Sequence, residues 1–280
     1  MISRNVKIPL AALIGGLAAL ALRIWNLRAG FEDGTGLPLP GHPSFPAMAL
    51  ALALTLGALA LLSRSIPANA APRFPFAPAK RPPAAIAVAG TFLLALAGFA
   101  DLFEAFTGQK IGARTLSYEY AFEGLIGGES VSVSPAAQAF GGLLTLLSAW
   151  ALFQCLRACL HENQRFRAPV LIPAVALSFR LVSVYRLASV NPVLEDYAPV
   201  LLALVFQTLG FYALSAFPFE CGNLRKFAAF SGAAVCSALC VLADRYEYLS
   251  TPLTLAGSAL TLTAFLLLAL DAPPRSSSNA

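Results

Sequence analysis

The chain has 280 residues, of which 58% are hydrophobic and only 12% charged, with a formal net charge of +5 and a mean hydropathy of +0.72. A soluble domain carries about 25% charged residues, so these proportions exclude a water-soluble globule of this size. Lipid must be the solvent for most of the surface. We therefore expect the lipid bilayer as the main partner and no nucleic acid.

The apolar segments predict an all-α integral membrane protein with about eight transmembrane helices. Each segment approaches the roughly 20 apolar residues that a membrane helix needs, and the alternating strands of a membrane β-barrel are missing. The expected helices are Val6–Trp25, Phe45–Leu62, Ala84–Phe103, Ala136–Leu156, Ala168–Tyr185, Tyr197–Phe217, Phe227–Tyr246 and Thr251–Leu270. The first is expected to be a retained signal anchor, and the fifth is the weakest because Arg180 interrupts it.

The basic residues predict the orientation. With the N-terminus inside, most of the 19 basic residues fall in inner segments. The inner set is Arg4, Lys7, Arg64, Arg73, Lys80, Arg81, Arg157, Arg165, Arg167, Arg225, Lys226 and Arg275. Because Lys and Arg are enriched in cytoplasmic loops, both termini are predicted to be cytoplasmic in a plasma (inner) membrane protein.

Two loops have distinctive compositions. The inner loop after the second segment, SRSIPANAAPRFPFAPAKRPP (63–83), is Pro-rich and basic. It is expected to be extended and poorly ordered, and a cytoplasmic or membrane partner protein is one hypothesis for its role. The long outer loop between the third and fourth segments contains LSYEYAFEGLI (116–126). That stretch predicts a short amphipathic surface helix, either in a binding loop or in a plain connector.

The two halves of the chain share an ordered series of motifs. ADLFEAF (100–106) near the end of the third segment matches ADRYEYL (243–249) near the end of the seventh, and TLG occurs in both the second and the sixth. Such an internal repeat predicts a tandem 4+4 duplication. The two four-helix units would be residues 1–160 and 161–280 in one intimate membrane domain. An even number of helices per unit gives both halves the same orientation.

The duplication brings one cluster of charges to the outer ends of four helices. The cluster, which is the predicted ligand-binding set, consists of Arg23, Asp101, Glu104, Arg180, Asp244 and Glu247. An i,i+3 spacing places Asp101 with Glu104, and Asp244 with Glu247, on one helix face. Arg180 is the deepest charge. Because a charge inside the bilayer costs about 2.5–3.5 kcal/mol, it is expected to face the interior and to pair with Asp101 or Asp244.

Two interpretations of this cluster remain open. In the structural one, matched ion pairs hold the bundle together. In the functional one, the charges line an outward-facing vestibule: spare carboxylates would favour a cationic or zwitterionic ligand, and spare Arg an anion.

No Walker A, GxGxxG or HExxH motif occurs, so no catalytic residue, cofactor or metal is predicted. The five Cys residues are expected to pack between helices, with a metal site at Cys155, Cys159, His161 and Cys221 as the alternative. The leading hypothesis is a membrane protein that binds or transports a small polar solute. A non-catalytic scaffold or sensor subunit is the second, and a lipid-modifying membrane enzyme is the third.

Overall fold

The computed structural model describes residues 7–32, 37–67, 72, 74–76, 81–109, 134–161, 168–188, 194–244, 246 and 248–272. Within these ranges the long elements are all helices. They are α1 (Lys7–Ala29), α2 (Ser44–Arg64), α3 (Arg81–Thr107), α5 (Pro135–His161), α6 (Ile172–Ala188), α7 (Leu194–Ser215), α8 (Leu224–Cys240) and α9 (Ser250–Asp271). Two short 3-10 turns, η2 (Ala168–Leu171) and η3 (Val241–Ala243), precede α6 and follow α8.

The chain is an all-α, multi-pass membrane protein. Seven of the described helices are long and apolar enough to cross a membrane. The exception is α6, which has 17 residues and follows η2 directly. The amphipathic stretch expected at 116–126 lies outside the described residues.

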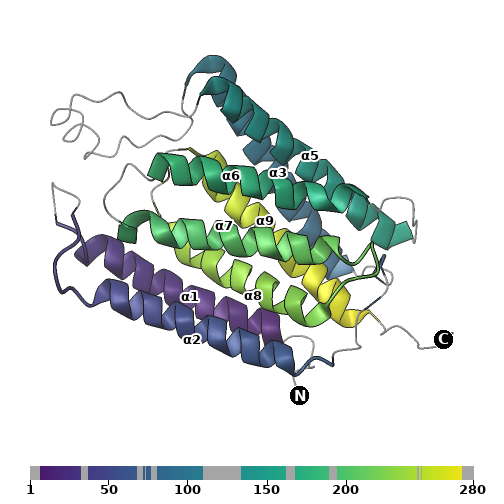
Figure 1. Ribbon diagram of the computed structural model, residues 1–280, viewed down its shortest axis with the longest axis horizontal. Helices are drawn as coiled ribbons and strands as arrows, with labels where there is room; N and C mark the ends of the chain where they lie inside the picture. The colour runs from purple at the N-terminus through teal and green to yellow at the C-terminus, as the bar shows by residue number, and fades with distance from the viewer. Residues whose placement is uncertain are drawn as a thin grey trace.

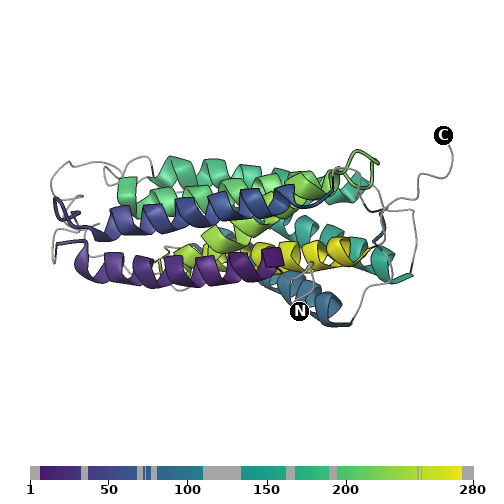
Figure 2. The ribbon, with the colours of Figure 1, turned by 90° about the horizontal axis from the view of Figure 1, so that it is seen from below.

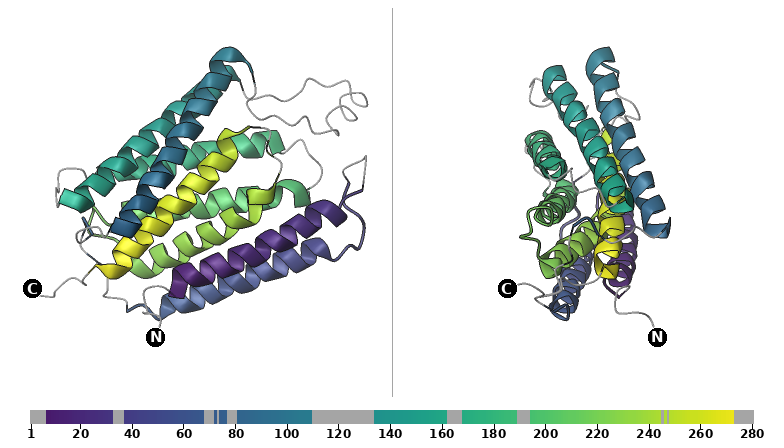
Figure 3. Two further views of the ribbon diagram at one scale, coloured as in Figure 1. Left: turned by 180° about the vertical axis from the view of Figure 1, so that it is seen from behind. Right: turned by 90° about the vertical axis from the view of Figure 1, so that its right-hand side faces the viewer.

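The helices alternate in direction along the bundle. In Figure 1, α1, α3, α6 and α8 run from the right of the view towards the left, while α2, α5, α7 and α9 return. Figures 2 and 3 show that the bundle is flattened, with α6 and α7 on one broad face and α1, α3 and α9 on the other. Consequently the carboxyl-terminal ends of α1, α3, α6 and α8 share one end of the bundle. We call it the ion-pair end, after the charged residues described below.

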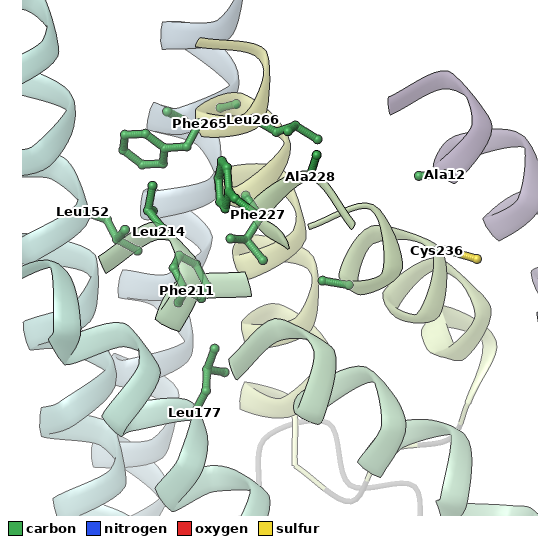
Figure 4. Close-up of a cluster of buried hydrophobic side chains, with 14 of the residues drawn as sticks. Ala12, Leu152, Leu177, Phe211, Leu214, Phe227, Ala228, Cys236, Phe265 and Leu266 are labelled. Atoms are coloured by element: carbon green, nitrogen blue, oxygen red, sulfur yellow. The ribbon is translucent and has the colours of Figure 1, made fainter. Parts of the chain in front are cut away.

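Burial rises from the first helix hairpin to the last helix. In the most apolar stretch of α2 only 17% is buried within the protein, whereas in that of α9 67% is buried. The exposed sides of α1 and α2 carry large apolar residues such as Ile14, Leu50 and Leu54, which suit contact with lipid. The interior around α7, α8 and α9 is filled by Phe and Leu side chains (Figure 4), among them Phe211 and Phe265, both completely buried.

Glycines set the spacing of α3 from its two neighbours. A methyl group on Gly90 would lie 2.8 Å from the backbone oxygen of Gly257 in α9, and one on Gly98 would lie 2.9 Å from that of Gly142 in α5. Small residues of this kind let membrane helices approach closely. The same contact brings α5 against Asp101, whose Cβ would be 3.0 Å from a methyl group on Gly142. The glycines therefore help to position the charged residues.

One part of the Pro-rich segment 63–83 departs from the expectation of an extended, poorly ordered loop. Phe76 is completely buried, with its ring centroid 5.5 Å from that of Phe74 and 5.3 Å from that of Phe217. Phe217 in turn packs on Phe227 at 5.5 Å. Aromatic pairs in such edge-to-face geometry stabilise beyond their buried area. The burial of Phe76 outweighs the tendency of the Pro-rich sequence to stay solvated.

Candidate functional site

Arg180, in the middle of α6, pairs with Asp101 of α3. Its Nη1 donates to Oδ2 of Asp101 at 2.5 Å. Its Nη2 donates to the hydroxyls of Ser250 and Thr251, at the start of α9, at 2.5 and 3.0 Å. Asp101 is one of the two partners predicted for Arg180, and the pair lies between three helices. The Nε atom is buried and has no hydrogen-bond partner among the described residues.

A second ion pair joins Arg23 of α1 to Asp244, which directly follows η3. Arg23 is completely buried, and its Nε donates to Oδ1 of Asp244 at 2.6 Å. Its Nη1 donates to Oδ1 of Asn26 at 3.0 Å, and Nδ2 of Asn26 in turn donates to the hydroxyl of Ser44. The Ser44 hydroxyl lies 2.7 Å from Nδ1 of His42. This network connects α1, α2 and the end of α8.

The two ion pairs cross the predicted boundary between the halves in a reciprocal way. Arg23 belongs to the first half and pairs with Asp244 of the second, whereas Arg180 of the second half pairs with Asp101 of the first. Arg23 and Arg180 occupy matching places in the proposed repeat, as do Asp101 and Asp244. The duplication itself stays a prediction.

The predicted Asp-x-x-Glu faces differ between the two halves. Asp101 and Glu104 are both helical in α3 and both buried, and Glu104 accepts a hydrogen bond from Nε2 of Gln138 in α5 at 2.8 Å. In the other half, the helix expected to reach Tyr246 ends at Cys240, and the backbone of Asp244 is extended, with ψ 151°. Asp244 therefore does not lie on a helix face, and Glu247 lies outside the described residues.

A pocket opens beside the Arg180–Asp101 pair, between α3, α5, α6 and α9. Its volume is about 60 Å³, which is room for a few water molecules or one small solute. Its polar lining comes from Asp101, Gln138, Thr145, Arg180, Ser183, Tyr248 and Thr251. Phe179 and short apolar side chains complete the wall. We call this the Arg180 pocket. Arg23 and Asp244 do not line it.

A smaller space continues past Arg180 towards the middle of the bundle. It measures about 10 Å³ and is lined by Thr145, Ser148, Thr254 and Ser258, together with apolar side chains. This is close to the volume that a single water needs. Arg180 and Thr145 border both spaces. Oγ of Ser258 is buried and lacks a hydrogen-bond partner among the described residues.

Tyr246 lies beside the Arg23–Asp244 network, in the loop before α9. Its hydroxyl donates to the backbone oxygen of Val241 at 2.6 Å. Burial, and then the negative charge of Asp244, raise the pKa of the Tyr246 phenol well above its ordinary value, while Arg23 opposes the shift. The phenol therefore stays neutral and holds the turn after η3 in place.

Several residues of the site were not predicted. Gln138, Ser250 and Thr251 contact the charges directly, and Asn26 and Ser44 extend the second network. The amides offered a signal, since Asn26 and Gln138 are polar residues beside long apolar runs. The hydroxyl residues offered little, because Ser and Thr are common in membrane helices, where they bond to the backbone of their own helix.

Within the described ranges, no three His, Cys, Asp or Glu side chains lie close enough together to hold a metal ion. Cys155 and Cys159 are buried in α5, whereas Cys221 is exposed in the turn before α8. Comparison of the chain with family models, with curated proteins and with solved structures finds no match.

Proposed function

We propose that this protein lies in the plasma membrane with both termini in the cytoplasm, and that it binds and transports a small polar solute. The solute would enter the Arg180 pocket from the outer side, at the ion-pair end of the bundle. One observation carries the proposal: a buried ion pair, Arg180 with Asp101, borders a pocket with several polar groups on its wall.

The energetic argument starts from the cost of charge in a membrane. Polar and charged groups in the bilayer are expensive and usually mark substrate or ion pathways. A pair with a purely structural role needs only to be packed, as Arg23 and Asp244 are. Arg180 and Asp101 instead border open space together with Gln138 and Ser183. Leaving polar groups beside a pocket is favourable where water or a solute supplies their missing hydrogen bonds.

The smaller space beyond Arg180 supports passage as well as binding. Its hydroxyls, from Thr145 and Ser148 of α5 and from Thr254 and Ser258 of α9, extend the polar lining of the Arg180 pocket inwards. A solute leaving the pocket in that direction would have to pass the guanidinium group. We infer that a movement of the Arg180 side chain accompanies transport.

A scaffold or sensor subunit is the second candidate, and the Arg23 network favours it. Arg23 and Asn26 are fully buried, and their hydrogen bonds join three segments of the chain. Such a network fixes helix positions without a ligand. If both ion pairs have this role, no solute is bound, and the protein acts through its contacts with other proteins.

Uptake by proteoliposomes separates the two candidates. The purified protein would be tested with a labelled panel of methylammonium, sodium, acetate, phosphate and glycine. Ser183 lines the pocket, while Ser178 is exposed one and a half turns earlier on the same helix; both hydroxyls donate to the carbonyl four residues back. We expect S183L to abolish uptake and S178L to retain it. Absence of uptake of every panel member by the folded wild-type protein would support the scaffold.

A further inference from the structure

The hydrogen-bond donors and acceptors on the wall of the Arg180 pocket are unequally available to a solute. The hydroxyl oxygen of Thr145 lies 2.9 Å from the carbonyl oxygen of Gly141, and that of Ser183 lies 3.0 Å from the carbonyl oxygen of Phe179. A carbonyl oxygen can only accept, so each hydroxyl donates its single proton to a hydrogen bond within its own helix. Only their lone pairs remain for the pocket.

The amide and the carboxylate of the pocket follow the same rule. Gln138 uses one of its two Nε2 protons to donate to the carboxylate of Glu104 at 2.8 Å, which leaves its Oε1 as an acceptor and one N–H. Asp101 engages Arg180 through Oδ2, and its Oδ1 receives no hydrogen bond from a described residue. Four different side chains therefore present acceptors at this wall.

Most of the N–H donors of Arg180 are already used. Nη1 and Nη2 donate to Asp101, Ser250 and Thr251. The N–H of Nε has almost no accessible surface, so a solute in the pocket does not reach it, and of the five N–H groups one on Nη1 is left. The charges of Arg180 and Asp101 offset each other, so the preference of the pocket depends on which hydrogen-bonding atoms face it.

From this accounting we infer that the Arg180 pocket selects a small cation, held by the acceptor oxygens of Asp101, Gln138, Thr145 and Ser183. The inference rests on the proposed function and names the substrate class of that site. Phe179 and Tyr248, which also line the pocket, suit the same class, because aromatic ring faces attract cations. The volume of about 60 Å³ limits the ligand to an alkali ion or a compact primary ammonium group.

Thermal stabilisation of the purified protein tests the charge preference. Methylammonium chloride, sodium chloride and potassium chloride would be compared with tetramethylammonium chloride at equal ionic strength. Tetramethylammonium acetate would test whether the pocket binds an anion instead. We expect saturable stabilisation by methylammonium or by one alkali ion, and none by tetramethylammonium, which lacks N–H donors and is too large. Methylammonium alone would identify an ammonium solute, whereas sodium or potassium alone would identify an ion site.

Removing single acceptors tests the assignment of the oxygens. T145V and S183A each take away one acceptor while the helix backbone keeps its own bonds, so each is expected to weaken cation binding about tenfold, as for a hydrogen bond to a charged group. S178A is the matched control and should leave the affinity unchanged. Equal affinities in all three variants would overturn the inference.

Stabilisation by acetate that S183L removes would show that the pocket binds a solute of the opposite charge: the proposed function would stand and the cation inference would fail. If no salt stabilises the wild-type protein and no panel member is taken up, both fail.

Discussion

Nη1 of Arg180 lies 2.5 Å from Oδ2 of Asp101 and joins the middle of α6 to α3 beside an open pocket, while the chemically identical pair of Arg23 and Asp244 lies outside that pocket. The protein therefore contains two Arg–Asp pairs with different surroundings. One pair has the setting of a binding site, and the other has that of a structural link.

The buried ion pair of Arg23 and Asp244 predicts a coupling between their mutations. R23Q and D244N should each destabilise the fold by about 3–5 kcal/mol, because each breaks a buried ion pair by removing one of its two charges. The double variant should lose less than the sum, since it removes both charges. Urea titration in mild detergent measures the free energy of unfolding of the two single variants and of the double variant. Additive losses would show that the two residues do not act as a pair.

The close approach of α3 to α9 predicts that Gly90 does not tolerate a side chain. G90A should destabilise the protein by about 1–3 kcal/mol, the usual cost of overpacking, because its methyl group would lie 2.4 Å from Oγ1 of Thr261. Gly57 in α2 is the control, as a methyl group there meets nothing within 4 Å. G57A is expected to be neutral or stabilising, since Ala favours a helix over Gly. Equal thermal stabilities for the two variants would contradict the packing.

The packing of the Pro-rich segment 63–83 against the turn between α7 and α8 predicts a large effect at Phe76. F76A should cost about 3–5 kcal/mol, as for other buried aromatic residues, because Phe76 is completely buried against Phe217. Phe106 at the end of α3 is 82% exposed, so F106A should change stability little. A thermal melt of both variants in the same detergent makes the comparison, and an unchanged melting temperature for F76A would show that the loop does not anchor the fold.

Tyr246 predicts a loss of stability at alkaline pH. Its pKa is raised in the folded protein, so the folded state keeps the phenolic proton more tightly than the unfolded state. The resulting contribution is complete below the ordinary tyrosine pKa of about 10 and is lost as the pH rises above it. Melting temperatures between pH 8 and 11 should fall less steeply for Y246F than for the wild type. Y212F is the control, since Tyr212 is 63% exposed; a matching change of slope in Y212F would argue against the role of Tyr246.

The sequence predicted the helices well because each membrane helix satisfies its own backbone and needs only an apolar run. It also predicted a carboxylate partner for Arg180, because an unpaired charge inside the bilayer is costly. It did not predict that α8 ends at Cys240 or that Phe76 is buried. Nor did it predict that Gln138, Ser250 and Thr251 surround the charges. Those features depend on which helix faces meet, and uniformly apolar helices carry little information about their neighbours.

The most direct test of the central claim is the reactivity of a cysteine placed in the pocket. S183C and S178C would be treated from outside on cells or vesicles that enclose a thiol scavenger, with two methanethiosulfonates, one carrying a primary ammonium group and the other a sulfonate. Cys221, exposed at the opposite end of the bundle, serves as the internal control and should react only in inside-out vesicles. We predict that S183C reacts from outside, faster with the cationic reagent, and that S178C does not react. An unreactive S183C, or one that reacts faster with the sulfonate, would contradict an outward-facing pocket for small cations.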